Sequence, residues 1–161
     1  MKIGIISDTH NTFHPNIAKI FKNLPYIIHA GDIGRGEILS RLQAIPGVQK
    51  VYAVLGNTDS PWELPDIPLR LDLEIEGHRI WVQHIIESPP SFYRTLAREE
   101  KEMPEVIIFG HTHQPYLKRM NETYFINPGS ATSPRGGFNP SVAILSFEAN
   151  RPQATIIDLA S

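Results

Sequence analysis

Seven side chains that can bind a divalent metal ion lie just after short apolar segments of the chain. They include an Asp-x-His pair and a His-x-His pair. Alternate side chains of an extended segment point to the same side, so each pair can face one centre or two adjacent centres. The chain has no cysteine, which leaves nitrogen and oxygen ligands, and this mixture suits Mn, Fe, Co, Ni or Zn better than Mg or Ca. The seven residues are Asp8, His10, Asp32, Asn57, His84, His111 and His113.

The number of these residues favours a metal centre over unrelated polar groups. A single histidine at the end of a strand is usually a polar group with an ordinary hydrogen-bond partner, and Asp-Thr or Asn-Thr after a strand is usually part of a turn. Five apolar segments that all end in ligand-type residues are hard to explain in that way. A structural zinc site uses four ligands, so seven candidates indicate two metal ions.

The elements that must position these residues can be predicted from apolar segments rich in Ile and Val, which favour strands. The first half of the chain alternates strand and helix, which predicts parallel strands joined by crossover helices. The second half contains hairpins, with tight turns at Glu76-Gly77 and Asn121-Glu122 and a longer turn at residues 149–152. The expected class is therefore α/β, a sandwich with mixed sheets. Strands are expected near residues 2–7, 26–30, 50–55, 70–76, 79–84, 106–109, 115–120, 123–127, 141–147 and 153–159, and helices near 14–23, 35–45 and 91–102.

This arrangement predicts that the candidate ligands meet. In open α/β sheets, ligands bind beyond the carboxyl ends of the strands, and all five ligand-bearing segments follow a predicted strand. Glycine precedes Asp32, Asn57 and His111, and we expect it to let the backbone bend where the strand ends. The five loops should therefore line one crevice.

Length and composition limit the classes of function. The chain has 161 residues, and we expect a single domain over residues 1–161. Its net charge of -2 offers no basic surface, so we do not expect a nucleic-acid partner. No apolar stretch is long enough to span a membrane, and Met1-Lys2 runs directly into a predicted strand without a signal peptide. We expect a cytoplasmic protein, and the sequence leaves a homo-oligomer open.

In order along the chain, these motifs resemble the signature of the calcineurin-like metallophosphoesterase superfamily. The short chain and the segment Asn127-Pro128-Gly129-Ser130 resemble its small bacterial and archaeal phosphodiesterases. The resemblance extends from residue 3 to about residue 147 and implies two mixed β-sheets flanked by helices. The motifs that carry it are Asp8-x-His10, Gly31-Asp32, Gly56-Asn57, His84 and Gly110-His111-x-His113.

The resemblance also implies a role for each candidate ligand. One metal ion would be bound by Asp8, His10 and His113, the other by Asn57, His84 and His111, and Asp32 would bridge both. Two cations about 3.5–4 Å apart can hold a hydroxide nucleophile and bind the phosphoryl oxygens of an in-line displacement. The expected substrate is a small phosphate ester, and a diester is favoured over a monoester.

Two features of the family are missing. Many members have a histidine directly after the metal-binding asparagine, where it can protonate the leaving group, but Thr58 stands there, followed by Asp59. No general acid is therefore evident. Many members also read His-Gly-His at the fourth ligand loop, whereas His84 is followed by Ile85-Ile86, which predicts a more apolar wall near His84.

Other residues have more ordinary expected roles. Arg35, Thr58 and Arg135 are candidates for contacts with the substrate, Arg35 because it lies near a helix N-terminus, which favours anions. His14 is expected to cap a helix, although it could instead approach the substrate, and His29 to pack inside or to support a ligand. We expect His78 in an exposed turn, Ser88-Pro89-Pro90 as a rigid loop that sets specificity, and residues 127–130 as a turn under the ligand loops.

Two other functions compete with a phosphoesterase. The small subunit of the retromer coat resembles the same branch and acts mainly as an assembly part, so a protein-binding scaffold is the first alternative. A decayed site should lack ligands, whereas all seven positions are filled here. A nuclease of the same superfamily is the second alternative, and the net charge argues against it.

Overall fold

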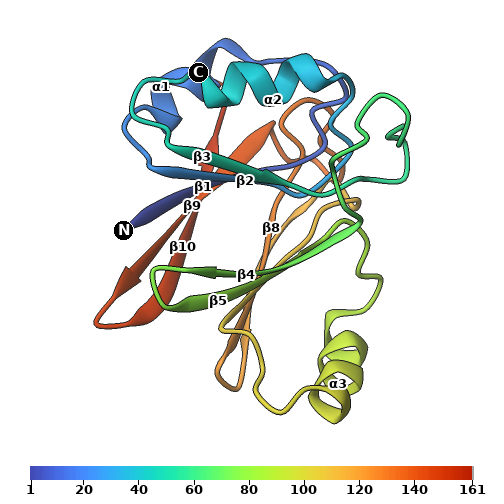
Figure 1. The fold of residues 1–161 in the computed structure, drawn as a ribbon, viewed down its shortest axis with the longest axis vertical. Coiled ribbons are helices and arrows are strands. Elements are labelled where there is room, and N and C mark those ends of the chain that lie inside the picture. The colour runs from blue at the N-terminus through green and yellow to red at the C-terminus, as the bar shows by residue number, and fades with distance from the viewer. Residues whose placement is uncertain (161) are drawn as a thin grey trace.

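Two five-stranded β-sheets face each other, and helices cover their outer faces (Figure 1). The computed structural model describes residues 1–160. The strand order is β10-β9-β1-β2-β3 in the first sheet and β4-β5-β6-β8-β7 in the second. The strands are β1 (Lys2–Ile6), β2 (Tyr26–His29), β3 (Lys50–Ala53), β4 (Arg70–Ile75), β5 (His78–Gln83), β6 (Val106–Ile108), β7 (Pro115–Met120), β8 (Thr123–Pro128), β9 (Ser141–Glu148) and β10 (Arg151–Asp158), and the helices are α1 (Pro15–Phe21), α2 (Gly36–Gln43) and α3 (Pro89–Glu99).

Both sheets are mixed. In the first, β1, β2 and β3 are parallel neighbours, and β9 and β10 add antiparallel strands on the other side of β1. In the second, β5, β6 and β8 are parallel neighbours, with β4 and β7 as antiparallel edge strands. The predicted α/β class with two mixed sheets and flanking helices is confirmed.

Alternation along the strands divides the apolar side chains into three layers. In β1, Ile3 and Ile5 pack against the second sheet, whereas Ile6 packs under α1 and α2. In β6, Val106 and Ile108 face the first sheet, whereas Ile107 packs with residues of α3. The layer between the sheets fixes how the carboxyl ends of β1, β2 and β3 lie relative to those of β5 and β6.

Three sequence predictions about turns are wrong. His78 does not lie in an exposed turn: it begins β5, its Nδ1 lies 2.8 Å from Oε2 of Glu105, and its ring stacks on Phe147. The turn at residues 149–152 is shorter, because Arg151 and Pro152 already pair in β10. Ser88-Pro89-Pro90 is the start of α3 and not a loop, since proline is readily accommodated in the first turn of a helix.

None of the helices in the described part of the chain has the length and apolar composition needed to cross a membrane.

Candidate metal centre

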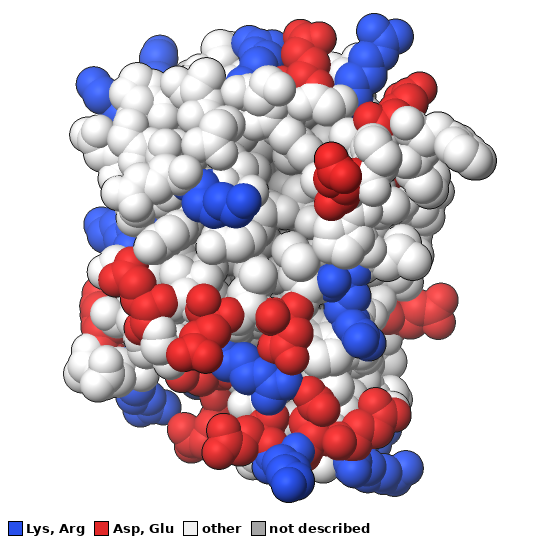
Figure 2. Space-filling model, in the orientation of Figure 1, with Lys and Arg blue, Asp and Glu red and all other residues white. Residues whose placement is uncertain are grey.

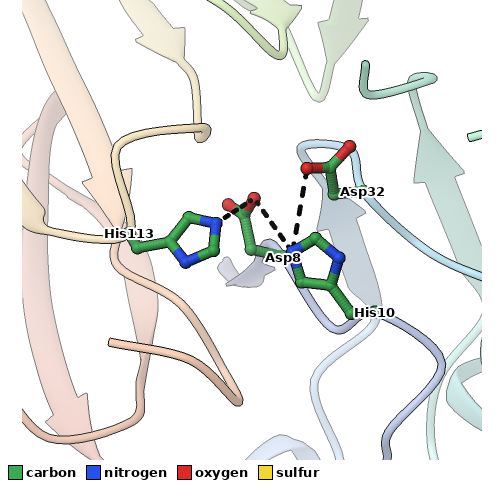
Figure 3. A group of neighbouring side chains, drawn as sticks. All are labelled: Asp8, His10, Asp32 and His113. Carbon is green, nitrogen blue, oxygen red and sulfur yellow. Dashed lines mark ion pairs between the residues drawn. The ribbon is translucent and has the colours of Figure 1, made fainter. Parts of the chain in front are cut away.

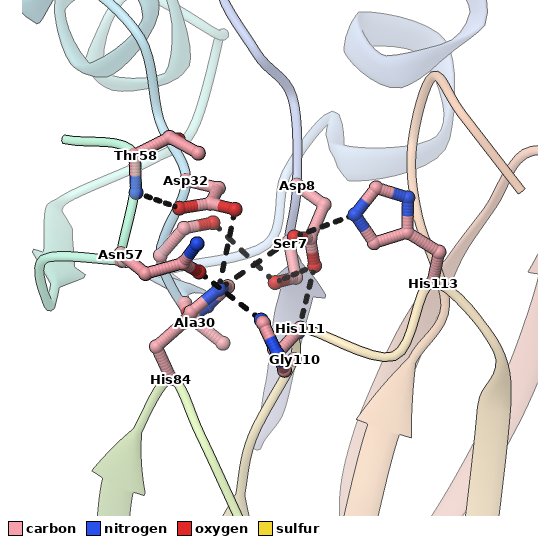
Figure 4. Close-up of polar contacts among 12 residues, drawn as sticks. Ser7, Asp8, Ala30, Asp32, Asn57, Thr58, His84, Gly110, His111 and His113 are labelled. Carbon is pink, nitrogen blue, oxygen red and sulfur yellow. Dashed lines mark hydrogen bonds and ion pairs between the residues drawn. The ribbon is translucent and has the colours of Figure 1, made fainter.

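All seven candidate ligands lie in one cluster where the carboxyl ends of five strands meet. Figure 4 shows six of them, and Figure 3 shows His10. The loops after β1, β2 and β3 of the first sheet and those after β5 and β6 of the second supply them. The predicted convergence of the five loops is therefore what the structure shows. Whether the cluster holds metal ions depends on its donor atoms.

One half of the cluster consists of Asp8, His10, Asp32 and His113, whose ligand atoms lie within 4.8 Å of one another. His10 and His113 lie on either side of the Asp8 carboxylate (Figure 3). Nε2 of His113 is 3.3 Å from Oδ1 of Asp8, and Nε2 of His10 is 3.8 Å from the same oxygen and 3.7 Å from Oδ2 of Asp32. These distances exceed hydrogen-bond length and leave room for an ion between the donors.

Asn57, His84 and His111 form the other half. Nδ1 of His111 lies 3.1 Å from Oδ1 of Asn57, and Nε2 of His84 lies 3.3 Å from Oδ2 of Asp32. Oδ2 of Asp32 thus faces both His10 and His84, so this carboxylate lies between the two halves of the cluster.

Several of the atoms that could bind a metal ion have no hydrogen-bond partner among the described residues. Oδ1 of Asp8, Nε2 of His10 and Nε2 of His84 are all buried from solvent without one among the described residues. A buried polar atom without a partner costs roughly 1–3 kcal/mol, so native proteins rarely leave three in one place. Divalent cations would satisfy all three, and the donor set fits such ions.

Hydrogen bonds of Nδ1 orient two of the histidines, so that Nε2 of each ring faces the carboxylates. Nδ1 of His84 donates to the carbonyl of Ala30 at 2.8 Å, and Nδ1 of His113 donates to the carbonyl of Ser133 at 2.6 Å. Because a carbonyl only accepts, the proton of each neutral ring lies on Nδ1, and the lone pair of Nε2 faces the cluster. This arrangement is typical of histidines that bind metal ions.

The backbone of the site adopts a conformation that L-residues rarely use. Asp8, His10, Asp32, His111 and His113 all have positive φ, between 44° and 73°. Asp and His are enriched among the few non-glycine residues found there, and such residues concentrate at functional sites. Folding therefore maintains an unfavourable backbone at five of the seven candidate ligands.

The glycines before the ligands have two different roles. Gly31 has a φ of 106°, as the expected bend requires, but Gly56 and Gly110 do not have positive φ. A Cβ at Gly56 would overlap Oδ1 of Asp32, and a Cβ at Gly110 would overlap the hydroxyl of Ser7. These two glycines leave room for the side chains of the site.

Four further side chains support the cluster, and sequence reasoning missed two of them, Ser7 and Thr132. The hydroxyl of Ser7, which is fully buried, donates to Oδ2 of Asp8 at 2.7 Å. The hydroxyls of Ser130 and Thr132 donate to the Asp8 carbonyl, and the amide of Asn127 donates to the Gly110 carbonyl. The segment at residues 127–130 thus braces the ligand loops, although its first two residues end β8 instead of forming a turn.

Asp59 has a different role from the acid considered for it. Its carboxylate accepts hydrogen bonds from the backbone amides of Ile33, Gly34 and Gly56 at 2.8–3.1 Å. Since those amides come from the loops that carry Asp32 and Asn57, Asp59 joins the two loops. An aspartate two residues after a candidate ligand is the only signal the sequence offered for this role.

Burial and nearby charges shift the ionisation of the cluster in opposite directions. Burial raises the pKa of Asp8, despite the hydrogen bond from Ser7. Burial also opposes ionisation of Asp32, but the nearby His84 imidazole and a hydrogen bond from the Thr58 amide outweigh it and lower the pKa of Asp32. Burial lowers the pKa of His84, but the Asp32 and Asp8 carboxylates outweigh it, so the net shift is upward. The centre therefore attracts positive charge, either as protons or as metal ions.

His29 and His14 have the supporting roles expected of them. His29 is fully buried, accepts from the Gly31 amide through Nδ1, and lies 3.0 Å from the Thr9 hydroxyl through Nε2. Burial lowers the pKa of His29 to about 3, so the ring is neutral. His14 caps α1, since its Nδ1 accepts from the amide of Asn16.

Two of the three candidate substrate contacts, Thr58 and Arg135, donate backbone hydrogen bonds to candidate ligands. The Thr58 amide donates to Oδ1 of Asp32 at 2.9 Å, and the Arg135 amide donates to the His113 carbonyl at 3.1 Å. Arg35 precedes α2, and all three side chains are exposed. Among the described residues, neither arginine side chain contacts a candidate ligand, so their role stays a prediction.

Comparison with known proteins agrees with these features. A family model described as the calcineurin-like phosphoesterase superfamily domain matches residues 1–150. A probable metallophosphoesterase of Methanothermobacter thermautotrophicus is 33% identical over 163 residues, which cover 98% of this chain and 92% of the relative.

Solved structures share the fold over nearly the whole chain. An archaeal phosphodiesterase has a TM-score of 0.74 at 25% identity, covering 98% of this chain and all of the other. Vps29 of Entamoeba histolytica, solved in complex with zinc, has a TM-score of 0.71 at 19% identity, covering 99% of each chain. At that identity the likeness to Vps29 concerns the fold alone.

Proposed function

Since the chain belongs to the calcineurin-like phosphoesterase superfamily, we propose that it hydrolyses phosphodiesters at a centre of two divalent metal ions. The observation that carries this proposal is the set of three buried donor atoms without partners, surrounded by converging candidate ligands. Relatives named phosphodiesterases support the preference for a diester. We further propose that residues 1–161 act as one catalytic domain.

The proposed ligands divide between the two halves of the cluster. We assign Asp8, His10 and His113 to one ion and Asn57, His84 and His111 to the other, with Asp32 between them. The position of Asp32 Oδ2 near both His10 and His84 supports the bridging role. The mixture of nitrogen and oxygen donors favours Mn, Fe, Co, Ni or Zn.

When bound, two such ions supply a hydroxide nucleophile at neutral pH and neutralise the charge of the phosphoryl oxygens. The side chains of the chain set the charge around them. Asp8 and Asp32 bring two negative charges against the four positive charges of two divalent ions, and the Asn57 amide adds none. The centre therefore keeps a net positive charge that attracts a phosphate ester. The His10 side chain, 32% exposed, lies where the cluster opens to solvent.

Protonation of the leaving group is where this chain differs from many relatives. Thr58 cannot act as an acid near neutral pH, and both oxygens of Asp59 accept hydrogen bonds from backbone amides. We infer that the enzyme cleaves aryl esters better than alkyl esters, because the oxygen of an aryl leaving group needs little protonation.

A protein-binding scaffold is the alternative function. The fold it shares with Vps29 keeps this reading open. The complete set of candidate ligands favours the enzyme. Because the Vps29 structure contains zinc, metal binding by itself does not distinguish the two functions.

A nuclease is not favoured by the distribution of charge. On the face shown in Figure 2, the Lys and Arg side chains lie scattered among Asp and Glu and do not form a continuous basic stripe. Together with the net charge of -2, this surface lacks the electrostatic pattern that nucleic-acid backbones require.

The decisive experiment is a metal-by-metal activity panel on protein stripped of metal. The substrates are bis(p-nitrophenyl) phosphate and p-nitrophenyl phosphate, and the metals are Mn, Fe, Co, Ni and Zn. We expect hydrolysis that requires added metal and is faster for the diester. Metal binding without hydrolysis of either ester would favour the scaffold, and faster hydrolysis of the monoester would reject the diester preference.

A further inference from the structure

A hollow of about 300 Å³ opens directly beside the candidate metal centre. It shares the side chains of Asn57 and His84 with the centre, so a group bound in the hollow would contact whatever the centre holds. Its volume is at the lower end of the range for small-molecule sites. The residues that line it are Leu55, Gly56, Asn57, Leu69, Arg70, Gln83, His84 and Ile85.

The rim of the hollow is unusually apolar for an exposed surface. Leu69 is 72% exposed and Ile85 is 39% exposed, and both belong to the few large apolar side chains that this structure leaves in solvent. The backbone holds Leu69 near the site, because the Leu55 amide donates to the carbonyl of Pro68 at 2.8 Å. Exposed apolar side chains that border a polar site typically mark a place where a ligand is bound.

Arg70 brings one positive charge to the lining of the hollow. The guanidinium of Arg70 stacks on the Trp81 ring, with Cζ 4.7 Å from its centroid. Nε1 of Trp81 donates to Oε1 of Gln83 at 2.9 Å, and Nε2 of Gln83 donates to the carbonyl of Ile85 at 3.0 Å. In the described part of the chain no carboxylate lies within ion-pair distance of Arg70, and the nearby Asp72 pairs with Arg79 and feels Arg70 only as a weaker charge. Arg70 can therefore still meet an anion.

From these contacts we propose that the hollow binds one esterified group of the substrate, and that this group is planar, mainly apolar and carries a negatively charged substituent. The apolar rim formed by Leu69 and Ile85 suits an aromatic ring, and Arg70 suits a carboxylate or a second phosphate on it. This inference rests on the proposed phosphodiesterase function and specifies its substrate class. It also gives Ile85, beside His84, the role of the expected apolar wall.

Binding of phosphonates to zinc-loaded protein tests the proposal without requiring hydrolysis. The phosphonate group should bind at the metal centre, and its substituent should bind in the hollow. Trp81 can report binding by fluorescence once Trp62, the other tryptophan and 92% exposed, is replaced in a Trp62→Phe background. We expect phenylphosphonate to bind roughly tenfold more tightly than methylphosphonate, the scale expected for partly burying an aromatic ring.

Two pairs of variants localise the effect. Leu69→Ser should reduce the phenyl-to-methyl ratio to about threefold or less, whereas Leu117→Ser, at a leucine 37% exposed on the opposite edge strand, should preserve it. 4-Carboxyphenylphosphonate should bind about threefold more tightly than phenylphosphonate. That gain should disappear in Arg70→Gln. It should persist in Arg41→Gln, the control, because Arg41 is an arginine of α2 whose guanidinium stacks on the ring of Phe13.

The outcomes separate this inference from the function it rests on. Equal affinity for methyl- and phenylphosphonate, or a ratio that Leu69→Ser leaves unchanged, would overturn the role of the hollow and leave the metal centre intact. Failure of every phosphonate to bind, with or without zinc, would reject the metal centre itself and the hollow with it.

Discussion

Nε2 of His84 lies 3.3 Å from Oδ2 of Asp32, and this contact joins a loop of the second sheet to a loop of the first. Neither residue could reach the other without the packing of the two sheets. The same carboxylate oxygen also faces His10. Asp32 is therefore the residue on which both halves of the cluster depend.

Asp32→Ala should be the most damaging single substitution. It removes the carboxylate shared by both proposed ions, so we expect metal content to fall below one ion per chain and activity on bis(p-nitrophenyl) phosphate to fall on the order of 10³-fold. Elemental analysis and steady-state kinetics measure the two effects. Asp66→Ala, at an exposed aspartate, is the matched control and should behave like wild type. If Asp32→Ala still holds two ions, the bridging assignment is wrong.

Metal should stabilise the fold, because it satisfies donor atoms that are otherwise buried without partners. At a zinc concentration of about 100 times Kd, the gain should be about 2.7 kcal/mol, which corresponds to a rise in Tm of roughly 5–10 °C. Thermal unfolding with zinc and with chelator measures it. His84→Asn should lose most of this rise.

The control for that experiment is His78→Gln. His78 contacts Glu105 and Phe147 far from the candidate ligands, so its replacement should lower Tm by itself yet preserve the rise caused by zinc. An equal loss of the rise in His78→Gln and His84→Asn would show that the zinc effect does not arise at the proposed centre.

His29 should make the metal-free protein sensitive to acid. The pKa of His29 is about 3 in the folded chain and near 6.5 in the unfolded chain. Below pH 6.5 the unfolded chain therefore binds a proton that the folded chain does not bind. Stability is therefore present above pH 6.5 and is lost as pH falls, by about 1.4 kcal/mol per pH unit. Between pH 6.5 and pH 5 the wild type should lose about 2 kcal/mol more than His29→Gln. The measurement is the free energy of unfolding in urea as a function of pH. If it changes equally with pH in wild type and His29→Gln, His29 is not the responsible group.

Rates should fall steeply as the pKa of the leaving group rises, because Thr58, directly after Asn57, is no acid near neutral pH and the Asp59 carboxylate accepts hydrogen bonds from backbone amides. A positioned acid typically contributes about 10²–10⁴-fold for poor leaving groups. Thr58→His should flatten this dependence, and it can be made without breaking the bond to Asp32, since that bond uses the backbone amide of Thr58. The measurement is a series of substituted phenyl and alkyl phosphodiesters with both proteins, and Thr58→Ser is the control. A flat dependence in the wild type, with chemistry rate-limiting, would mean that another group supplies the proton.

Much of the fold was predictable, because apolar segments and turn residues are local signals. Every strand and helix lies near its predicted position, and the strand ends correctly indicated where the candidate ligands gather. The errors fall where tertiary contacts override local signals. His78, beside a turn glycine, is drawn out of solvent by Glu105 and Phe147, and a proline pair that reads as a loop begins α3.

The supporting parts of the site were not predictable for a different reason. Asp59 joins two loops that come together only when β2 and β3 pair, and Arg70 reaches the hollow only because β4 places it opposite Gln83 of β5. The positive φ values at Asp8, His10, Asp32, His111 and His113 are set by the fold as a whole. The Ile33 and Gly34 amides that bind Asp59 lie 26 and 25 residues away in the sequence, so no local signal connects them to it.

The proposed donors of each ion come from both sheets. Asp8 and His10 of the first sheet meet His113 of the second, and Asn57 of the first meets two histidines of the second. Each ion would thus act as a cross-link between the two sheets, in addition to the hydrogen bonds between their loops and to the apolar side chains packed between them, such as Val82 and Ile108. The affinity for metal then depends on how closely the two sheets pack. A cavity created deep in that apolar layer, far from any ligand, would therefore weaken metal binding, as a substitution of a ligand would.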